Sequence, residues 1–137
     1  MSDTADGGVR PVLGVVGLGS MGMGAALSAL RRGLQVWGLD LRAQARERFA
    51  AEGGHATESL AELAAACDVV QLLVVNAAQT EQLLFGEPGL VTLLKPGAVV
   101  IASATVDPAL PPQWEARLAE RGLHLIDGPV SGGARKA

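Results

Sequence analysis

A glycine-rich turn near the start of the chain constrains the fold more than any other feature. The apolar run 12–16 leads into this turn, and small and apolar residues at helical spacing follow it. The turn consists of Gly17, Leu18, Gly19, Ser20, Met21 and Gly22. This order predicts a strand, a tight turn and a helix. In such a unit the first glycine makes the turn, the second allows a phosphate group to approach, and the third lets the helix pack on the strand.

An acidic residue stands at the end of the next predicted strand. The second apolar run, 35–39, ends in Asp40. Its distance from Gly22 is close to the roughly 20 residues that separate such a turn from the carboxylate that binds the adenosine ribose. A glycine-rich turn by itself is weak evidence, because such turns often only reverse the direction of the chain and bind no ligand. The full order of strand, turn, helix, strand and acid predicts a dinucleotide site, with the pyrophosphate at the turn and the ribose at Asp40.

Composition favours a single domain with an aliphatic core. The chain has 137 residues, 49% of them hydrophobic and only 3% aromatic. Val, Leu and Ala must therefore build the core, which suits a parallel sheet covered by helices. The net charge is −3 and no dense basic cluster occurs, which argues against a nucleic acid or a membrane surface as partner.

Few residues in the sequence suggest metal or redox chemistry. The single cysteine, Cys67, excludes an internal disulfide and a multi-cysteine metal site, and we interpret it as a small buried hydrophobe. His55 and His124 have no carboxylate placed to orient them, so we expect neither to be a catalytic base. The polar segment 1–10 lacks the apolar stretch of a secretory signal and is predicted to be a disordered tail. We expect a cytoplasmic protein without a bound metal.

The rest of the chain alternates between strand and helix patterns. Further strands are predicted at 55–57, 69–75, 98–102 and 124–127. Helices are predicted at 42–52, 60–66, 78–85 and 90–94, and from Pro111-Pro112 to Gly122. Alternation with short connections predicts a Rossmann-type doubly wound α/β fold over residues 11–133. Its parallel sheet should have the strand order 3-2-1-4-5-6, with helices on both faces.

Polar residues follow two of these strands at the edge where open α/β sheets bind ligands. Asn76 comes directly after the strand 69–75, where it either contacts the cofactor or caps the following helix. Ser103 and Thr105 follow the strand 98–102 in the same way.

Three stretches together resemble the β-hydroxyacid dehydrogenases, a family that includes 3-hydroxyisobutyrate, tartronate semialdehyde and 6-phosphogluconate dehydrogenases. They are the glycine turn at 17–22, the sequence Ser-Ala-Thr-Val-Asp-Pro at 103–108 and the sequence Asp-Gly-Pro-Val-Ser-Gly-Gly at 127–133. The segments 23–26, 74–79 and 84–86 look most like the branch of L-threonate dehydrogenases.

This resemblance implies roles for further residues, with NAD as the cofactor and a small hydroxy acid as the substrate. Val75 and Asn76 would line the cofactor groove, and Thr105 would lie beside the nicotinamide. The substrate would be bound by Ser131, Gly132 and Gly133. The chain departs from the usual family sequence at Ala102, Ala104, Gly128, Ala25 and Ser28.

The resemblance also implies where the catalytic lysine lies. In the family this lysine belongs to a helical second domain that follows the Ser-Gly-Gly loop, so we expect it beyond Ala137. We interpret residues 134–137 as the start of the linking helix, with Lys136 as a solvated residue. The chain is therefore predicted to hold the NAD-binding domain and no catalytic residue, and its parent to oligomerise through the helical domain. The alternative is a stand-alone nucleotide-binding or regulatory module without catalysis.

The choice between NAD and NADP depends on two neighbouring charges. Asp40 accepts hydrogen bonds from a ribose diol and repels a 2′-phosphate, which favours NAD. Arg42 could reach a 2′-phosphate, which favours NADP. We expect NAD, because the acid stands at the strand end itself and Leu41 follows it.

Overall fold

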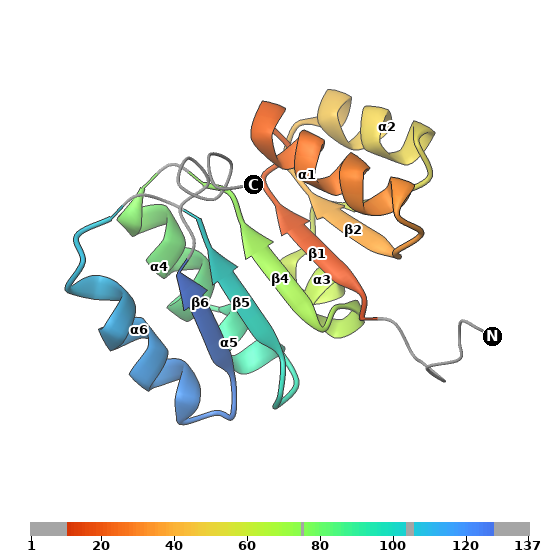
Figure 1. The fold of residues 1–137 in the computed structure, drawn as a ribbon. Coiled ribbons are helices and arrows are strands. Elements are labelled where there is room, and N and C mark those ends of the chain that lie inside the picture. The colour runs from red at the N-terminus through yellow and green to blue at the C-terminus, as the bar shows by residue number, and fades with distance from the viewer. Residues whose placement is uncertain (1–10, 75, 104–105, 128–137) are drawn as a thin grey trace.

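The computed structural model describes residues 11–74, 76–103 and 106–127. Its centre is a six-stranded parallel sheet with the order β3-β2-β1-β4-β5-β6 (Figure 1). The strands are β1 Leu13–Val16, β2 Val36–Leu39, β3 His55–Thr57, β4 Val69–Leu72, β5 Val99–Ala102 and β6 His124–Asp127. The predicted Rossmann-type topology and strand order are confirmed.

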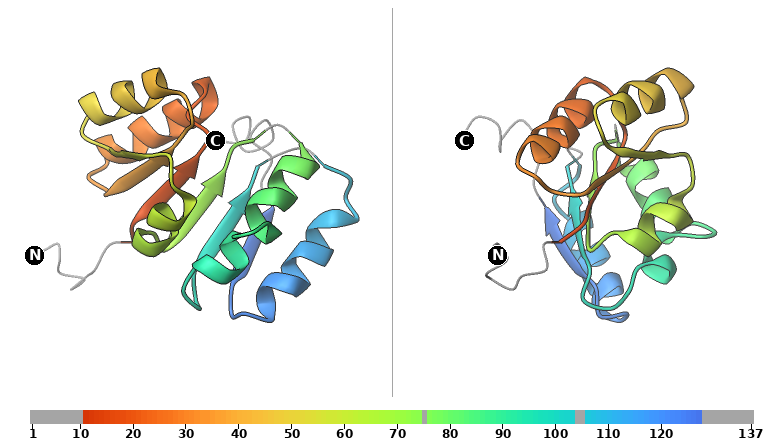
Figure 2. Two further views of the ribbon diagram at one scale, coloured as in Figure 1. Left: turned by 180° about the vertical axis from the view of Figure 1, so that it is seen from behind. Right: turned by 90° about the vertical axis from the view of Figure 1, so that its right-hand side faces the viewer.

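Six helices of the described ranges connect these strands. They are α1 Ser20–Arg31, α2 Ala43–Ala51, α3 Leu60–Ala66, α4 Ala77–Phe85, α5 Leu90–Leu93 and α6 Leu110–Ala119. Right-handed crossovers put α1 and α2 on one face of the sheet and α3 to α6 on the other, as the view from behind shows (Figure 2). No helix among them is long and apolar enough to cross a membrane.

Each face of the sheet has its own core. On the face of α1 and α2, Val15 and Val36 pack with Phe49 of α2. On the opposite face, strands β4 and β5 pack against α3 to α6, with Trp114 and Leu118 from α6. The fully buried residues are mainly leucine and valine, as expected from the composition.

Two elements, β4 and α6, differ from their predicted bounds by more than one residue at an end. The strand predicted at 69–75 ends at Leu72, because Leu72 pairs with Val16 and Ala102, the last residues of both neighbouring strands. The chain then leaves the ladder and leads toward α4. Helix α6 begins at Leu110, before Pro111 and Pro112. Both prolines lie in its first turn, where backbone N–H groups have no partner within the helix and a missing one costs little.

Both ends of the chain lie outside the described residues. The disordered tail expected at 1–10 and the linking helix expected from 134 to Ala137 therefore stay predictions. The same holds for the placement of the catalytic lysine beyond Ala137, which no described residue tests.

Candidate functional site

Two glycines of the turn are required by the protein's own packing. Gly17 has a φ of 101°, and a Cβ there would lie 2.6 Å from the carbonyl oxygen of Leu73. A Cβ on Gly22 would overlap the carbonyl oxygen of Gly17. The first glycine therefore makes the turn beside the end of β4, and the third lets α1 approach β1.

Gly19 has no such internal reason to be glycine. Its φ of −71° is open to any residue, and a Cβ built on it would meet nothing within 4 Å. Gly19 is the N-cap of α1, and no side chain of the described residues caps this helix. The N–H groups of Ser20, Met21 and Gly22 lie in its first turn, where no intrahelical acceptor exists. Free donors and the positive end of the helix dipole thus face open space, an arrangement that binds phosphate groups.

The acid at the end of β2 is hydrogen-bonded directly to the glycine turn. The backbone N–H of Leu18 donates to Oδ2 of Asp40 at 2.8 Å. The Asp40 side chain is only 10% exposed. The N–H of Leu18 is therefore committed to Asp40, and the Leu18 side chain is buried in the core beside α1.

Arg42 donates three further hydrogen bonds to the same carboxylate. Its backbone N–H and its Nε–H both donate to Oδ1 of Asp40 at 2.9 Å, and Nη2 donates to Oδ2 at 3.0 Å. These hydrogen bonds, with the Arg42 side chain contributing most, hold the pKa of Asp40 well below its usual range. Arg46 supports the loop from the other side, since its Nη1 donates to the carbonyl oxygens of Asp40 and Leu41.

A cavity of about 520 Å³ joins the turn, the acid and helix α4. Its walls are Val16, Gly17, Leu39, Asp40, Leu41, Val74, Ala78, Gln79, Gln82 and Leu83. Leu41 is 78% exposed at its mouth. Aliphatic walls with two glutamines suit a flat heterocycle with polar edges, such as an adenine.

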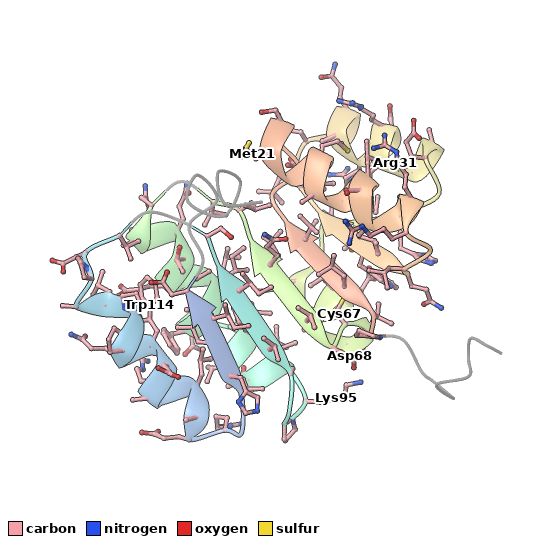
Figure 3. All side chains as sticks on the ribbon, in the orientation of Figure 1. Met21, Arg31, Cys67, Asp68, Lys95 and Trp114 are labelled. Atoms are coloured by element: carbon pink, nitrogen blue, oxygen red, sulfur yellow. The ribbon has the colours of Figure 1, made fainter. Side chains whose placement is uncertain are left out.

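A second cavity, of about 290 Å³, lies between α1 and α2. It is bordered by Gly19, Ser20, Met23, Arg42 and Arg48, with Leu18, Gln44 and Ala45. Met21, which is 55% exposed, lies in the first turn of α1, at the edge of the sheet where the strands end (Figure 3). Cys67, Asp68 and Lys95 lie at the opposite edge, where the strands begin.

Two of the polar residues after β4 and β5, Asn76 and Ser103, have structural partners. Asn76 caps α4, because its Oδ1 accepts a hydrogen bond from the N–H of Gln79 at 2.8 Å. Ser103 is buried and accepts a long hydrogen bond, 3.5 Å, from Nε2 of Gln71. Capping was one of the two roles considered for Asn76, and its contact with a cofactor stays a prediction. Val75, Thr105 and the loop 131–133 lie outside the described residues.

Sequence reasoning missed two parts of this site. The first is the double contact of the Arg42 side chain with Asp40. The sequence analysis considered Arg42 only as a possible ligand of a 2′-phosphate. The second is the wall that α4 contributes, with Ala78, Gln79, Gln82 and Leu83. Residues separated by one, three or four positions lie on one face of a helix. This spacing was the signal in the sequence that could have identified the wall.

The fold and this site define a dinucleotide-binding domain of the Rossmann class. Residues 12–137 match the family described as the NAD binding domain of 6-phosphogluconate dehydrogenase. The chain belongs to this family, and the resemblance to the β-hydroxyacid dehydrogenases is confirmed.

Similar proteins are hydroxyacid dehydrogenases of more than twice this length. The chain is 53% identical to an L-threonate dehydrogenase of Cupriavidus necator, over 91% of this chain and 42% of that protein. It is 47% identical to an L-threonate dehydrogenase of Escherichia coli K12, over 91% of this chain and 42% of that protein. A crystal structure of 3-hydroxyisobutyrate dehydrogenase from Salmonella typhimurium superimposes with a TM-score of 0.85 and 48% identity, over 93% of this chain and 45% of that one. The chain thus spans less than half the length of these relatives.

Proposed function

We propose that this chain is the cofactor-binding part of an NAD-dependent dehydrogenase that oxidises a small hydroxy acid of the L-threonate or 3-hydroxyisobutyrate type. The observation that carries the proposal is the 520 Å³ cavity, which borders both the glycine turn at Gly17 and the acid Asp40. The substrate class follows from the named activities of the relatives at 53% and 48% identity.

Each part of the dinucleotide has a matching group in the chain. The pyrophosphate is assigned to the turn from Gly17 to Gly22, where α1 offers free N–H groups in its first turn. The adenosine ribose is assigned to Asp40, and the adenine to the cavity between Leu41 and α4. NAD, when bound, supplies the hydride acceptor.

The remaining assignments concern the nicotinamide and the substrate. Val75 and Asn76 line the cofactor groove, Thr105 lies beside the nicotinamide, and the loop 131–133 binds the substrate's carboxylate and hydroxyl. The acid/base is a lysine beyond Ala137, in a helical second domain of the parent protein, and the same domain forms a homo-oligomer. We place the parent in the cytoplasm, where Cys67 stays reduced.

The proposal includes a preference for NAD over NADP. The carboxylate of Asp40, to which the ribose is assigned, is ionised at neutral pH, since its pKa lies below the ordinary aspartate value. An ionised carboxylate accepts hydrogen bonds from a diol and repels a phosphate at the same place.

Gly19 provides a direct test of the pyrophosphate assignment. A Cβ at Gly19 would project into the open space before α1, so Gly19→Ala should leave folding intact and weaken NADH binding about tenfold or more. Gly24→Ala is the matched control, because a Cβ there also meets nothing within 4 Å but lies farther along the helix. Titration of the purified 137-residue chain with NADH, followed by fluorescence or calorimetry, gives both affinities.

Two results would contradict the proposal. The first is an unchanged NADH affinity in Gly19→Ala, and the second is tighter binding of NADPH than of NADH by the unaltered chain.

A further inference from the structure

The carboxylate of Asp40 has no acceptor position left for a ligand. A carboxylate offers about four lone-pair positions on its two oxygens. Oδ1 accepts from the backbone N–H and the Nε–H of Arg42. Oδ2 accepts from the backbone N–H of Leu18 and from Nη2 of Arg42. A ribose can therefore bind Asp40 only after one of these donors has left.

The four donors differ in how firmly the fold holds them. The N–H groups of Leu18 and Arg42 belong to the backbone at the glycine turn and at the start of α2, and they are fixed by both elements. The other two belong to one guanidinium, on a side chain that is 63% exposed. The Arg42 side chain is thus the donor that can leave without a change of the fold.

The guanidinium of Arg42 also has the geometry of the ligand that it would compete with. Nε and Nη2 donate in parallel, one to each oxygen of Asp40, at 2.9 and 3.0 Å. The two adjacent hydroxyls of a ribose are likewise a pair of donors that can serve both oxygens of one carboxylate. The arginine fork and the ribose diol therefore need the same edge of Asp40.

We propose that Arg42 is a built-in competitor for the adenosine ribose, and that it sets the affinity and the specificity of the cofactor site. Dinucleotide binding displaces the guanidinium from Asp40, and the second cavity, which Arg42 borders together with Arg48, gives it room. This inference rests on the proposed function, because it requires a ribose at Asp40.

A displaced Arg42 changes the charge balance that a 2′-phosphate meets. The phosphate of NADP is repelled by Asp40 and attracted by the nearby guanidinium. NAD binding gains no such attraction and still has to displace the side chain. Arg42 therefore lowers the preference for NAD over NADP that Asp40 alone would impose.

The Arg42→Ala variant tests the competition. Exposed ion pairs are weak, so we expect NADH to bind about two- to fivefold more tightly to the variant than to the unaltered chain. NADPH should bind more weakly or equally, so the ratio of the two affinities shifts toward NADH. Arg42→Lys keeps the charge without the fork and should give an intermediate NADH affinity while it retains more of the NADPH affinity. Arg31→Ala removes an exposed charge from the last turn of α1, away from the second cavity, and it should leave NADH binding within about twofold.

A second measurement follows the Arg42 side chain itself by NMR. The Nε–H signal of Arg42 should show a hydrogen-bonded donor in the free chain and move toward the value of a solvent-exposed arginine on saturation with NADH. Arg42→Ala identifies the signal.

The outcomes separate this inference from the proposed function. NADH binding to the unaltered chain with equal or weaker binding to Arg42→Ala would overturn the inference alone, as would an Arg42 signal that does not respond to NADH. The same gain of affinity in Arg31→Ala would also overturn it, by indicating a general charge effect. Absence of NADH binding to both the unaltered chain and Arg42→Ala would overturn the proposed function as well.

Discussion

The backbone N–H of Leu18 donates a hydrogen bond of 2.8 Å to Oδ2 of Asp40. This bond joins the middle of the glycine turn to the residue that follows β2, and the N–H of Gly17 reinforces it by donating to the carbonyl oxygen of Leu39 at 2.9 Å. The acid thus has a structural task, to hold the turn, beside the ligand-binding task proposed for it.

The structural task predicts a loss of stability in Asp40→Asn. The amide would keep one oxygen as an uncharged acceptor and replace the other with an NH2 group, which cannot accept a hydrogen bond from Leu18 or Arg42. We expect a decrease of about 1–3 kcal/mol in the free energy of unfolding at pH 7, measured by urea denaturation. Glu115→Gln is the control, because Glu115 is an exposed residue of α6, far along the chain from the turn. Equal stability of the two variants would contradict a structural role for Asp40.

The lowered pKa of Asp40 also predicts a pH dependence. The folded carboxyl binds its proton less readily than the unfolded one. Its contribution to the free energy of unfolding is therefore complete above the unfolded pKa of about 3.9. The contribution is lost as the pH falls from there through the folded pKa. Urea denaturation between about pH 2.5 and 7 should therefore give a shallower acid dependence for Asp40→Asn than for the unaltered chain. Identical slopes would show that Arg42 and Leu18 do not stabilise the ionised form.

Cys67 is predicted to be inert while the chain is folded. The side chain is fully buried in the core, and burial, followed by the negative charge of Asp68, raises the pKa of its thiol to about 12. A thiol reagent at about pH 8 should therefore modify it only at the rate of unfolding, as followed by absorbance with and without urea. Because the unfolded thiol ionises near about pH 8.5, stability should fall as the pH rises above that value. Rapid stoichiometric modification without denaturant would contradict both expectations.

Gly14 is predicted to be required by the packing between β1 and α3. A Cβ there would lie 2.8 Å from Cδ2 of Leu63 and 2.9 Å from Sγ of Cys67. We expect Gly14→Ala to cost about 1–3 kcal/mol in thermal or urea unfolding. Adding Cys67→Ala should recover part of this loss, since it removes one of the two close atoms. Strictly additive effects of the two changes would show that the sulfur is not the obstacle.

The 137-residue chain is predicted to bind NAD without oxidising a hydroxy acid. Hydride transfer needs a base within about 3 Å of the substrate hydroxyl, and the proposal places that base in a second domain, beyond Ala137. An assay with NAD and either L-threonate or 3-hydroxyisobutyrate should give no turnover above background. Turnover at a normal dehydrogenase rate that Lys136→Ala abolishes would place the base within this chain.

Local sequence patterns were sufficient for most of the fold. The strand and helix periodicities placed all six strands, and the order 3-2-1-4-5-6 followed from their alternation and from the rules of connection. The boundary of β4 was missed, because the apolar run to Val75 carries no sign of where the neighbouring strands end. The start of α6 was placed too late, because prolines within a first turn were taken as its limit.

The sequence by itself determined that a glycine turn leads from a strand into a helix, and that an acid ends the next strand. Both depend on residues close together in the chain, where spacing and backbone preferences act directly. Only the tertiary structure decided what surrounds the acid: the N–H of Leu18, the fork of Arg42 and the wall of α4 around one cavity. These contacts depend on strand register, rotamers and the path of distant helices, and packing of the whole domain fixes them together.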